Sequence, residues 1–220
     1  MKRETKIRDA YKASKNVYDD ALTQKKLWSK FYIRFFWGMD DLDVSRRVLD
    51  AIPSDFSGKL LDVPVGTGVF TCETYKRLPH ARVTALDYSE DMLAQAKARF
   101  AGNGLANVSC EQGDVGALPY GDAAFDIVLS MNGLHAFPDK DAAFSETARV
   151  LAPGGLFIGC TYICGERGRS DFVVKRILQP RGWFTPPFQT KRGLIEILKR
   201  HYAEVDVRNL QAIAHFRCVK

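Results

Sequence analysis

The chain has 220 residues, of which 46% are hydrophobic and 26% charged, and its formal net charge is +6. This length and apolar content suffice for one sizeable core, which predicts a single folded domain. Residues 1–20 are basic without a following apolar segment, and residues 31–39 are too short for a bilayer and contain Arg34. We therefore expect neither a secretory signal nor a membrane span, and a cytoplasmic protein.

The cysteines show no spacing typical of a zinc site, and we expect no bound metal. Cys160 and Cys164 fall near the same predicted strand, where four residues separate them by roughly 13 Å, too far for a disulfide. We expect reduced thiols at all five positions: Cys72, Cys110, Cys160, Cys164 and Cys218.

Helical periodicity dominates the segment before the first predicted strand. Within residues 5–52, an apolar stripe predicts a buried helix face formed by Leu42, Val48, Leu49 and Ile52. We therefore divide the chain into an N-terminal helical cap, residues 1–55, and a core, residues 56–220.

From residue 58 onward, short apolar segments alternate with helical ones. Ser89 is a good N-cap for one predicted helix, and Pro153-Gly154-Gly155 is expected to end another. The alternation predicts stacked βαβ units and a parallel sheet covered on both faces. The predicted strands are residues 59–63, 82–87, 107–112, 125–131 and 155–162.

The pattern changes after Tyr162. Residues 163–189 are rich in Gly, Pro, Arg and aromatics, and we expect this insertion to cover the substrate site. A helix over 190–202 then precedes two strands, 204–210 and 212–219, whose short connection predicts an antiparallel pair at the sheet edge. The expected fold class is α/β: a doubly wound, mostly parallel seven-stranded sheet with an antiparallel edge strand.

The first predicted strand leads into a glycine turn, LLDVPVGTGVF. Gly66 and Gly68 let the backbone approach a ligand, and Asp87, ending the second strand, is placed to accept hydrogen bonds from a ribose diol. Both dinucleotides and S-adenosylmethionine fit this arrangement. Thr71 stands where a dinucleotide turn carries its third small residue, and Asp62 suits a cationic ligand better than a pyrophosphate, which favours the second cofactor.

Four segments carry a family resemblance: LLDVPVGTG, ALDYSEDMLAQAKAR, GDVGALPYGDAAFDIVLSMNGLHAF and RVLAPGGLFI. In their order and spacing, over about residues 56–160, the chain resembles the class I S-adenosylmethionine-dependent methyltransferases, of the small type related to ubiquinone-biosynthesis C-methyltransferases. The family has glycine where this chain has Pro64. Because proline lacks an N–H and fixes φ, it is tolerated only where that glycine is extended and donates no hydrogen bond.

The resemblance implies S-adenosyl-L-methionine as cofactor, S-adenosyl-L-homocysteine as product, and a Rossmann-like methyltransferase fold. By position it places Asp62 near the methionyl ammonium, Asp87 on the ribose and Asp114 on the adenine. The implied cofactor-binding residues are Asp62, Val63, Gly66, Thr67, Gly68, Asp87, Tyr88, Met92, Gly113, Asp114, Val115, Ser130, Met131 and Asn132.

An activated methyl donor requires a base only where the acceptor must lose a proton, and His135, after the fourth strand, is the candidate. Aromatic side chains with a few arginines suit a flat or apolar acceptor that carries a carboxylate or phosphate. The candidate acceptor-binding residues are Tyr18, Trp28, His135, Arg167, Trp183 and Phe184.

We thus expect methyl transfer to a small anionic or aromatic acceptor, with O- or C-methylation favoured over N-methylation. The segment after the fourth strand reads NGLH, which lacks the tetrad of nucleobase N-methyltransferases and argues against nucleic acid. An RNA or lipid methyltransferase is an alternative supported by the basic residues of 165–200, and a membrane surface is the less favoured partner. A non-catalytic cofactor-binding scaffold is the third alternative. The protein is expected to be a monomer or a homodimer.

Overall fold

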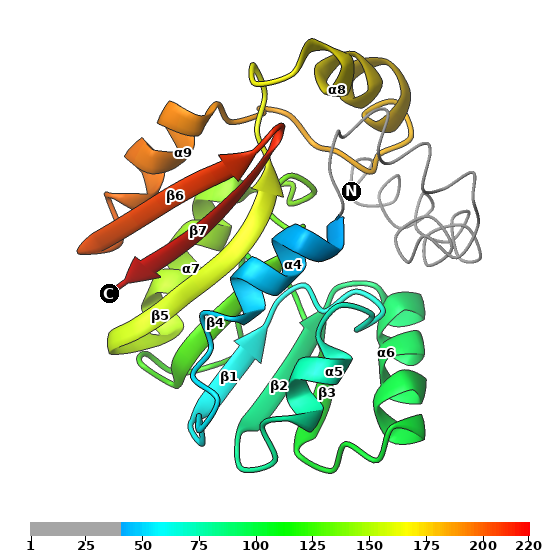
Figure 1. The fold of residues 1–220 in the computed structure, drawn as a ribbon, viewed down its shortest axis with the longest axis vertical. Helices are drawn as coiled ribbons and strands as arrows, with labels where there is room; N and C mark the ends of the chain where they lie inside the picture. The colour runs from blue at the N-terminus through cyan, green and yellow to red at the C-terminus, as the bar shows by residue number, and fades with distance from the viewer. Residues whose placement is uncertain (1–40) are drawn as a thin grey trace.

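The computed structural model describes residues 41–220 (Figure 1). Tyr18, Trp28 and most of the predicted cap, residues 1–55, lie outside these residues. The described part of that cap is α4 (Asp41–Leu49), which buries Val44, Val48 and Leu49 in the core on one face of the sheet. The expected buried stripe therefore packs on the sheet as far as it is described.

A seven-stranded sheet in the order β3-β2-β1-β4-β5-β7-β6 forms the centre of the described residues. The first five strands are parallel, and β7 runs antiparallel to both β5 and β6. Gln211, with φ of 52°, lies in the tight turn of the β6–β7 hairpin. These findings confirm the expected fold class. The strands are β1 (Lys59–Asp62), β2 (Arg82–Asp87), β3 (Val108–Gln112), β4 (Phe125–Met131), β5 (Leu151–Tyr162), β6 (Glu204–Leu210) and β7 (Ile213–Val219).

Helices cover both faces of the sheet (Figure 1). Apolar side chains of α4, α5 and α6 belong to the core cluster on one face, and those of α7 and α9 to the cluster on the other. Ser89 caps α6 as expected, because its side chain accepts a hydrogen bond from the Met92 amide at 3.3 Å. The remaining helices are α5 (Cys72–Lys76), α6 (Glu90–Gly102), α7 (Lys140–Val150), α8 (Gly168–Val173), the π-helix η1 (Val174–Leu178) and α9 (Lys191–Leu198).

The expected end of α7 was wrong. The helix ends at Val150, and Leu151 already has extended dihedrals, φ −78° and ψ 134°, and pairs with Phe125 in the sheet. Pro153 explains the early end, because its ring would clash with the carbonyl four residues back in a continuing helix. The fifth strand therefore starts before the Pro-Gly-Gly sequence rather than after it.

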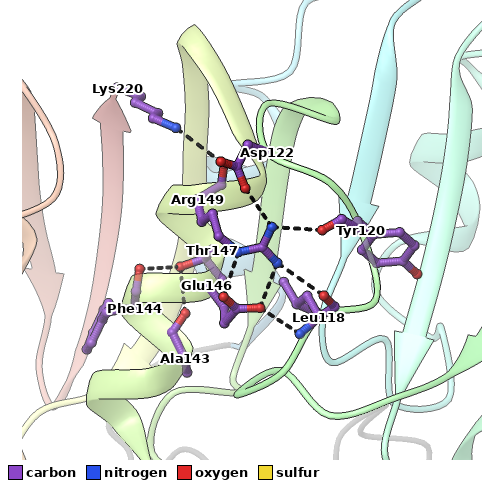
Figure 2. Close-up of polar contacts among 9 residues, drawn as sticks. All are labelled: Leu118, Tyr120, Asp122, Ala143, Phe144, Glu146, Thr147, Arg149 and Lys220. Carbon is purple, nitrogen blue, oxygen red and sulfur yellow. Dashed lines mark hydrogen bonds and ion pairs between the residues drawn. The ribbon is translucent and has the colours of Figure 1, made fainter.

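Arg149 in the last turn of α7 anchors the loop that follows β3 (Figure 2). Its guanidinium donates to the carbonyl oxygens of Leu118 at 3.1 Å and Tyr120 at 2.8 Å. It also pairs with both carboxylate oxygens of Glu146, at 2.7 and 2.8 Å, and with Asp122 at 2.9 Å. The loop is thus held to a helix by charge-assisted hydrogen bonds.

The predicted insertion, residues 163–189, contains α8 and η1 and is attached to the core at both ends. The Tyr162 hydroxyl donates to Asp171 Oδ1 at 2.6 Å, and Lys140 Nζ donates to the Thr185 carbonyl at 2.6 Å. All five cysteines are free thiols, as expected. In residues 41–220, no helix combines the length and hydropathy needed to cross a bilayer.

Candidate cofactor-binding site

A pocket lies at the carboxyl ends of β1, β2 and β4. The strand order reverses between β1 and β4, and ligands of doubly wound sheets bind at this kind of switch point. The pocket wall consists of Val63, Pro64, Val65, Gly66, Thr67, Val69, Phe70, Thr71, Leu86, Asp87, Tyr88, Ser89, Met92, Gly113, Asp114, Val115, Met131, Asn132, Ala136, Phe137 and Pro138.

Most of the residues predicted to bind the cofactor lie in this wall. Asp62, Gly68 and Ser130 lie outside the wall, and Asp62 and Ser130 are 0% and 1% exposed. The predicted residues that line the pocket are Val63, Gly66, Thr67, Asp87, Tyr88, Met92, Gly113, Asp114, Val115, Met131 and Asn132.

The glycine turn requires both of its glycines. Gly66 and Gly68 have φ of +57° and +68°, a region that side chains with a Cβ rarely adopt. A Cβ on Gly68 would lie 2.6 Å from Cζ of Phe100 in α6, so the turn packs directly on that helix. The Gly66 amide donates to Asp87 Oδ2 at 2.8 Å, which ties the turn to the end of β2.

Asp87 is held by two backbone amides. Its Oδ2 accepts from Gly66 and its Oδ1 from Ser89, each at 2.8 Å. Burial raises the pKa of Asp87 to about 6, against the opposing effect of these two hydrogen bonds. A carboxylate offers about four acceptor positions, so two remain for the hydroxyls of a ribose.

Asp62, the last residue of β1, is fully buried behind the pocket wall. Its Oδ2 accepts a hydrogen bond from the Tyr75 hydroxyl at 2.7 Å, whereas Oδ1 has no partner in the described part of the chain. Burial raises the pKa of Asp62 to about 7. The acid is therefore oriented by Tyr75 and does not itself line the pocket.

The opposite wall follows β3. Asp114 is exposed and lines the pocket, and its Oδ1 accepts from the Gly116 amide at 2.8 Å. Tyr88 is 51% exposed, whereas Met92 in the same wall is buried. These residues offer a carboxylate acceptor and two side chains able to flank a flat ring.

Pro64 leaves the turn intact. The amides on either side of it form the strand contacts, because Val63 donates to the Leu129 carbonyl and Val65 to the Leu86 carbonyl, each at 2.9 Å. The missing N–H at Pro64 therefore interrupts neither contact. The ring lines the pocket and packs so closely on Gly133 that a Cβ there would lie 2.2 Å from the Pro64 Cδ.

His135 does not line this pocket. Its ring stacks on Phe184 with centroids 4.0 Å apart, and its Nδ1 accepts from the Tyr162 amide at 3.4 Å. Burial and the nearby Lys140 charge lower the pKa of His135 to about 3. The imidazole is therefore neutral near pH 7, and one of its nitrogens already serves as an acceptor within the fold.

The other candidate acceptor-binding residues that the structure describes also lie outside the pocket wall. Arg167 is the N-cap residue of α8, Trp183 packs half-buried against the core, and Phe184 is buried beneath His135. Sequence reasoning missed an apolar part of the wall, namely Val69, Phe70, Ala136, Phe137 and Pro138. The position of these residues beside the glycine turn and the NGLH segment was the signal that could have identified them.

Comparison with known proteins shows similarity to methyltransferases. Residues 60–155 match the model of a methyltransferase domain. The chain is 36% identical over 139 residues to a demethylmenaquinone methyltransferase of Thermus thermophilus, covering 63% of each chain. It is 41% identical over 114 residues to the demethylmenaquinone methyltransferase of Staphylococcus aureus, covering 51% of this chain and 46% of that protein. The chain thus spans less than two thirds of the length of these curated relatives.

Solved structures show the same fold. An S-adenosylmethionine-dependent methyltransferase from Thermotoga maritima superposes with a TM-score of 0.70 at 17% identity, covering 97% of this chain and 99% of that one. A phosphoethanolamine N-methyltransferase from Haemonchus contortus, in complex with S-adenosyl-L-methionine, superposes with a TM-score of 0.67 at 18% identity over 82% of this chain and 52% of that one.

The sheet order and the pocket at its switch point define a Rossmann-like domain of the nucleotide-binding type. Within this fold, residues 60–155 match the model of a methyltransferase domain, and the chain is similar in sequence to demethylmenaquinone methyltransferases.

Proposed function

We propose that the protein transfers the methyl group of S-adenosylmethionine to a small-molecule acceptor, with O- or C-methylation favoured. One observation carries this proposal: a single pocket joins the acids Asp87 and Asp114 to an apolar wall that includes Phe70 and Phe137. The acids suit the adenosine part of the cofactor, and the apolar wall leaves room for a second, less polar molecule.

The proposed cofactor contacts follow from the acceptors in the wall. Asp87 uses its remaining lone pairs for the ribose hydroxyls, and Asp114 accepts from the adenine amino group. Tyr88 and Met92 flank the adenine ring. When bound, the cofactor supplies a methyl group on a sulfonium leaving group, so that the chain contributes mainly orientation and exclusion of water.

The proposed acceptor is a hydroxylated aromatic ring of the quinol type. Among the described residues, the pocket wall contains no Lys, Arg or His, and its uncommitted part is apolar. A flat ring fits such a surface better than a free carboxylate or phosphate, which would require a cation. The demethylmenaquinone methyltransferases among the relatives support the same class of acceptor.

His135 is proposed as a supporting residue and not as a general base. A general base needs a free acceptor nitrogen within reach of the acceptor's hydroxyl, and the Nδ1 of His135 already accepts from Tyr162. The histidine and Phe184 instead support the loop after β4 from behind. Arg167 and Trp183 belong to the insertion that we propose covers the pocket together with the N-terminal cap.

The test is a methyl-transfer assay with three acceptor classes: a demethylated naphthoquinol, an amine such as histamine, and an unmodified RNA. We expect S-adenosylhomocysteine and a methylated naphthoquinol, with a loss of about 100-fold or more in the isosteric Asp87→Asn variant. Cofactor binding without product from any acceptor would favour the scaffold alternative. Methylated RNA would favour the RNA alternative.

A further inference from the structure

Two buried oxygen atoms, one at the end of β1 and one at the start of α5, lack hydrogen-bond partners among the described residues. Asp62 Oδ1 and Thr71 Oγ1 make no hydrogen bond within the described part of the chain, although their residues are 0% and 2% exposed. Unsatisfied buried polar atoms are rare and costly in native proteins, so these two atoms must bond to each other, to a ligand, or to both.

The Thr71 hydroxyl is also unused by its own helix. Thr71 is the N-cap residue of α5, a position where threonine commonly accepts a backbone N–H, yet its side chain forms no capping bond. The hydroxyl nevertheless lies near enough to Asp62 to oppose, in part, the rise in the pKa of Asp62 caused by burial. The side chain therefore faces the acid instead of the helix amides.

Of the two residues, only Thr71 reaches the pocket. Thr71 lies in the pocket wall and Asp62 does not. The Tyr75 hydroxyl occupies Oδ2 of Asp62 at 2.7 Å and thereby leaves Oδ1 as the free acceptor. Thr71 is therefore the residue of this pair that a ligand in the pocket can contact.

We propose that Thr71 is the residue through which the buried Asp62 recognises the ammonium group of the cofactor's methionyl end. The hydroxyl donates its hydrogen to Asp62 Oδ1 and accepts an N–H from the ammonium. One hydroxyl can do both, because it carries one donor and two acceptor lone pairs. This inference rests on the proposed function and adds a specificity residue to it.

This relay of hydrogen bonds, from the ammonium through the Thr71 hydroxyl to Asp62, also explains how the pocket distinguishes cofactors. A buried carboxylate behind Thr71 attracts a cation and repels a pyrophosphate, which carries negative charge at the corresponding place. An apolar side chain at position 71 would remove the hydrogen bonds that connect Asp62 Oδ1 to the ligand. The hydroxyl, not the size of the side chain, is therefore the required feature.

The experiment compares two nucleosides by isothermal titration calorimetry. S-adenosylhomocysteine carries the amino-acid group, and 5′-methylthioadenosine shares the adenosine and sulfur but lacks that group. In Thr71→Val we expect S-adenosylhomocysteine to bind about 10- to 100-fold more weakly, while 5′-methylthioadenosine changes by less than about 2-fold. Thr71→Ser keeps the hydroxyl and should stay within about 3-fold of wild type for both.

Thr74→Val is the matched control, because Thr74 is buried in α5 one turn later but does not line the pocket. It should change neither affinity. Combining Thr71→Val with Asp62→Asn should cost little more than either change alone, since both interrupt one relay.

Three results would overturn the relay. One is an unchanged affinity for S-adenosylhomocysteine in Thr71→Val. Another is an equal loss of affinity for both nucleosides in this variant, which would mean that Thr71 only supports the turn. The third is additive losses in the double variant. If wild type binds neither nucleoside, the proposed function fails and the relay fails with it.

Discussion

Asp62 and Asp87 are two carboxylates at neighbouring strand ends that differ in depth and in partners. Asp87 is 7% exposed, lines the pocket and accepts two amides, whereas Asp62 is 0% exposed and accepts one phenolic hydroxyl. Burial raises the pKa of Asp62 to about 7 and that of Asp87 to about 6. Both acids therefore titrate within a pH range that is accessible to experiment.

The first prediction concerns stability. Because the folded-state pKa of Asp62 lies above its unfolded value, the folded protein holds more protons than the unfolded chain between about pH 4 and 7. The contribution of Asp62 to the free energy of unfolding should therefore fall as pH rises through this range. We expect Asp62→Asn, which cannot ionise, to gain stability relative to wild type between pH 5 and 8, by an amount on the order of 1–4 kcal/mol.

Urea unfolding of both proteins at several pH values measures this difference. A difference that does not vary with pH would mean that Asp62 is ionised throughout and that burial does not control its charge.

The second prediction concerns cofactor affinity. If the ammonium group interacts with ionised Asp62, cofactor binding must release a proton from part of the molecules near pH 7. The affinity for S-adenosylhomocysteine should then increase between pH 6 and 8 in wild type, and increase less in Asp62→Asn, where only Asp87 still titrates. Calorimetry in two buffers of different ionisation enthalpy detects the released proton directly. A pH-independent affinity in wild type would contradict the interaction.

The third prediction separates a catalytic from a supporting role for His135. In His135→Asn, the side-chain Oδ1 replaces the acceptor Nδ1, while the titratable ring is lost. We expect kcat to fall less than about 10-fold and its pH profile to stay unchanged, since removal of a general base typically costs 100-fold or more. A larger loss with a changed pH profile would restore His135 as the base.

At the scale of elements, the glycine turn and α6 depend on each other. Phe100 of α6 is buried, and its ring occupies the space where a Cβ on Gly68 would lie. With Phe100 in this position, the turn can therefore keep its shape only where residue 68 is glycine.

The fourth prediction follows from this contact. Gly68→Ala combines a strained φ of +68° with a clash against Phe100, and we expect a loss of about 2–4 kcal/mol in unfolding free energy together with weaker cofactor binding. Gly104→Ala is the matched control, because its φ is +69° but nothing lies within 4 Å of the added Cβ. It should cost only the backbone strain, about 1–2 kcal/mol. Equal losses in the two variants would show that the contact with Phe100 is unimportant.

At the scale of the whole molecule, the pocket depends on segments that are far apart in the sequence. Its wall combines the turn after β1, the end of β2, the loops after β3 and β4, and Met92 of α6. Arg149 of α7 holds the loop after β3 (Figure 2), so helices on both faces contribute to the geometry of one site.

The fifth prediction uses this dependence. A ligand that binds only the assembled pocket stabilises the folded state by RT ln(1 + [L]/Kd), about 2.7 kcal/mol at one hundred times Kd. We expect S-adenosylhomocysteine at that concentration to raise the midpoint of thermal unfolding by about 5–10 °C, and NAD to leave it unchanged. An equal shift with NAD would contradict the assignment of the cofactor.

The sequence by itself determined the fold class, and it predicted where the candidate site lies. Apolar periodicity, Ser89 as N-cap and the glycine turn are local signals, and they predicted the order of strands and helices and the importance of Asp87. The end of α7 was misplaced because the helical pattern continues to Leu151, whereas Pro153 prevents the helix from continuing and Leu151 pairs with Phe125 in the sheet.

Only the tertiary structure decided how deep each side chain lies. Asp62 ends a central strand paired on both sides, by β2 and β4, so its carboxyl is enclosed behind the turn and Thr71 takes its place in the wall. His135 follows a strand end as well, yet packing against Phe184 turns its ring away from the pocket wall. A motif identifies residues by their position in the sequence. Burial depends on contacts between segments far apart in the sequence, and these contacts form only on folding.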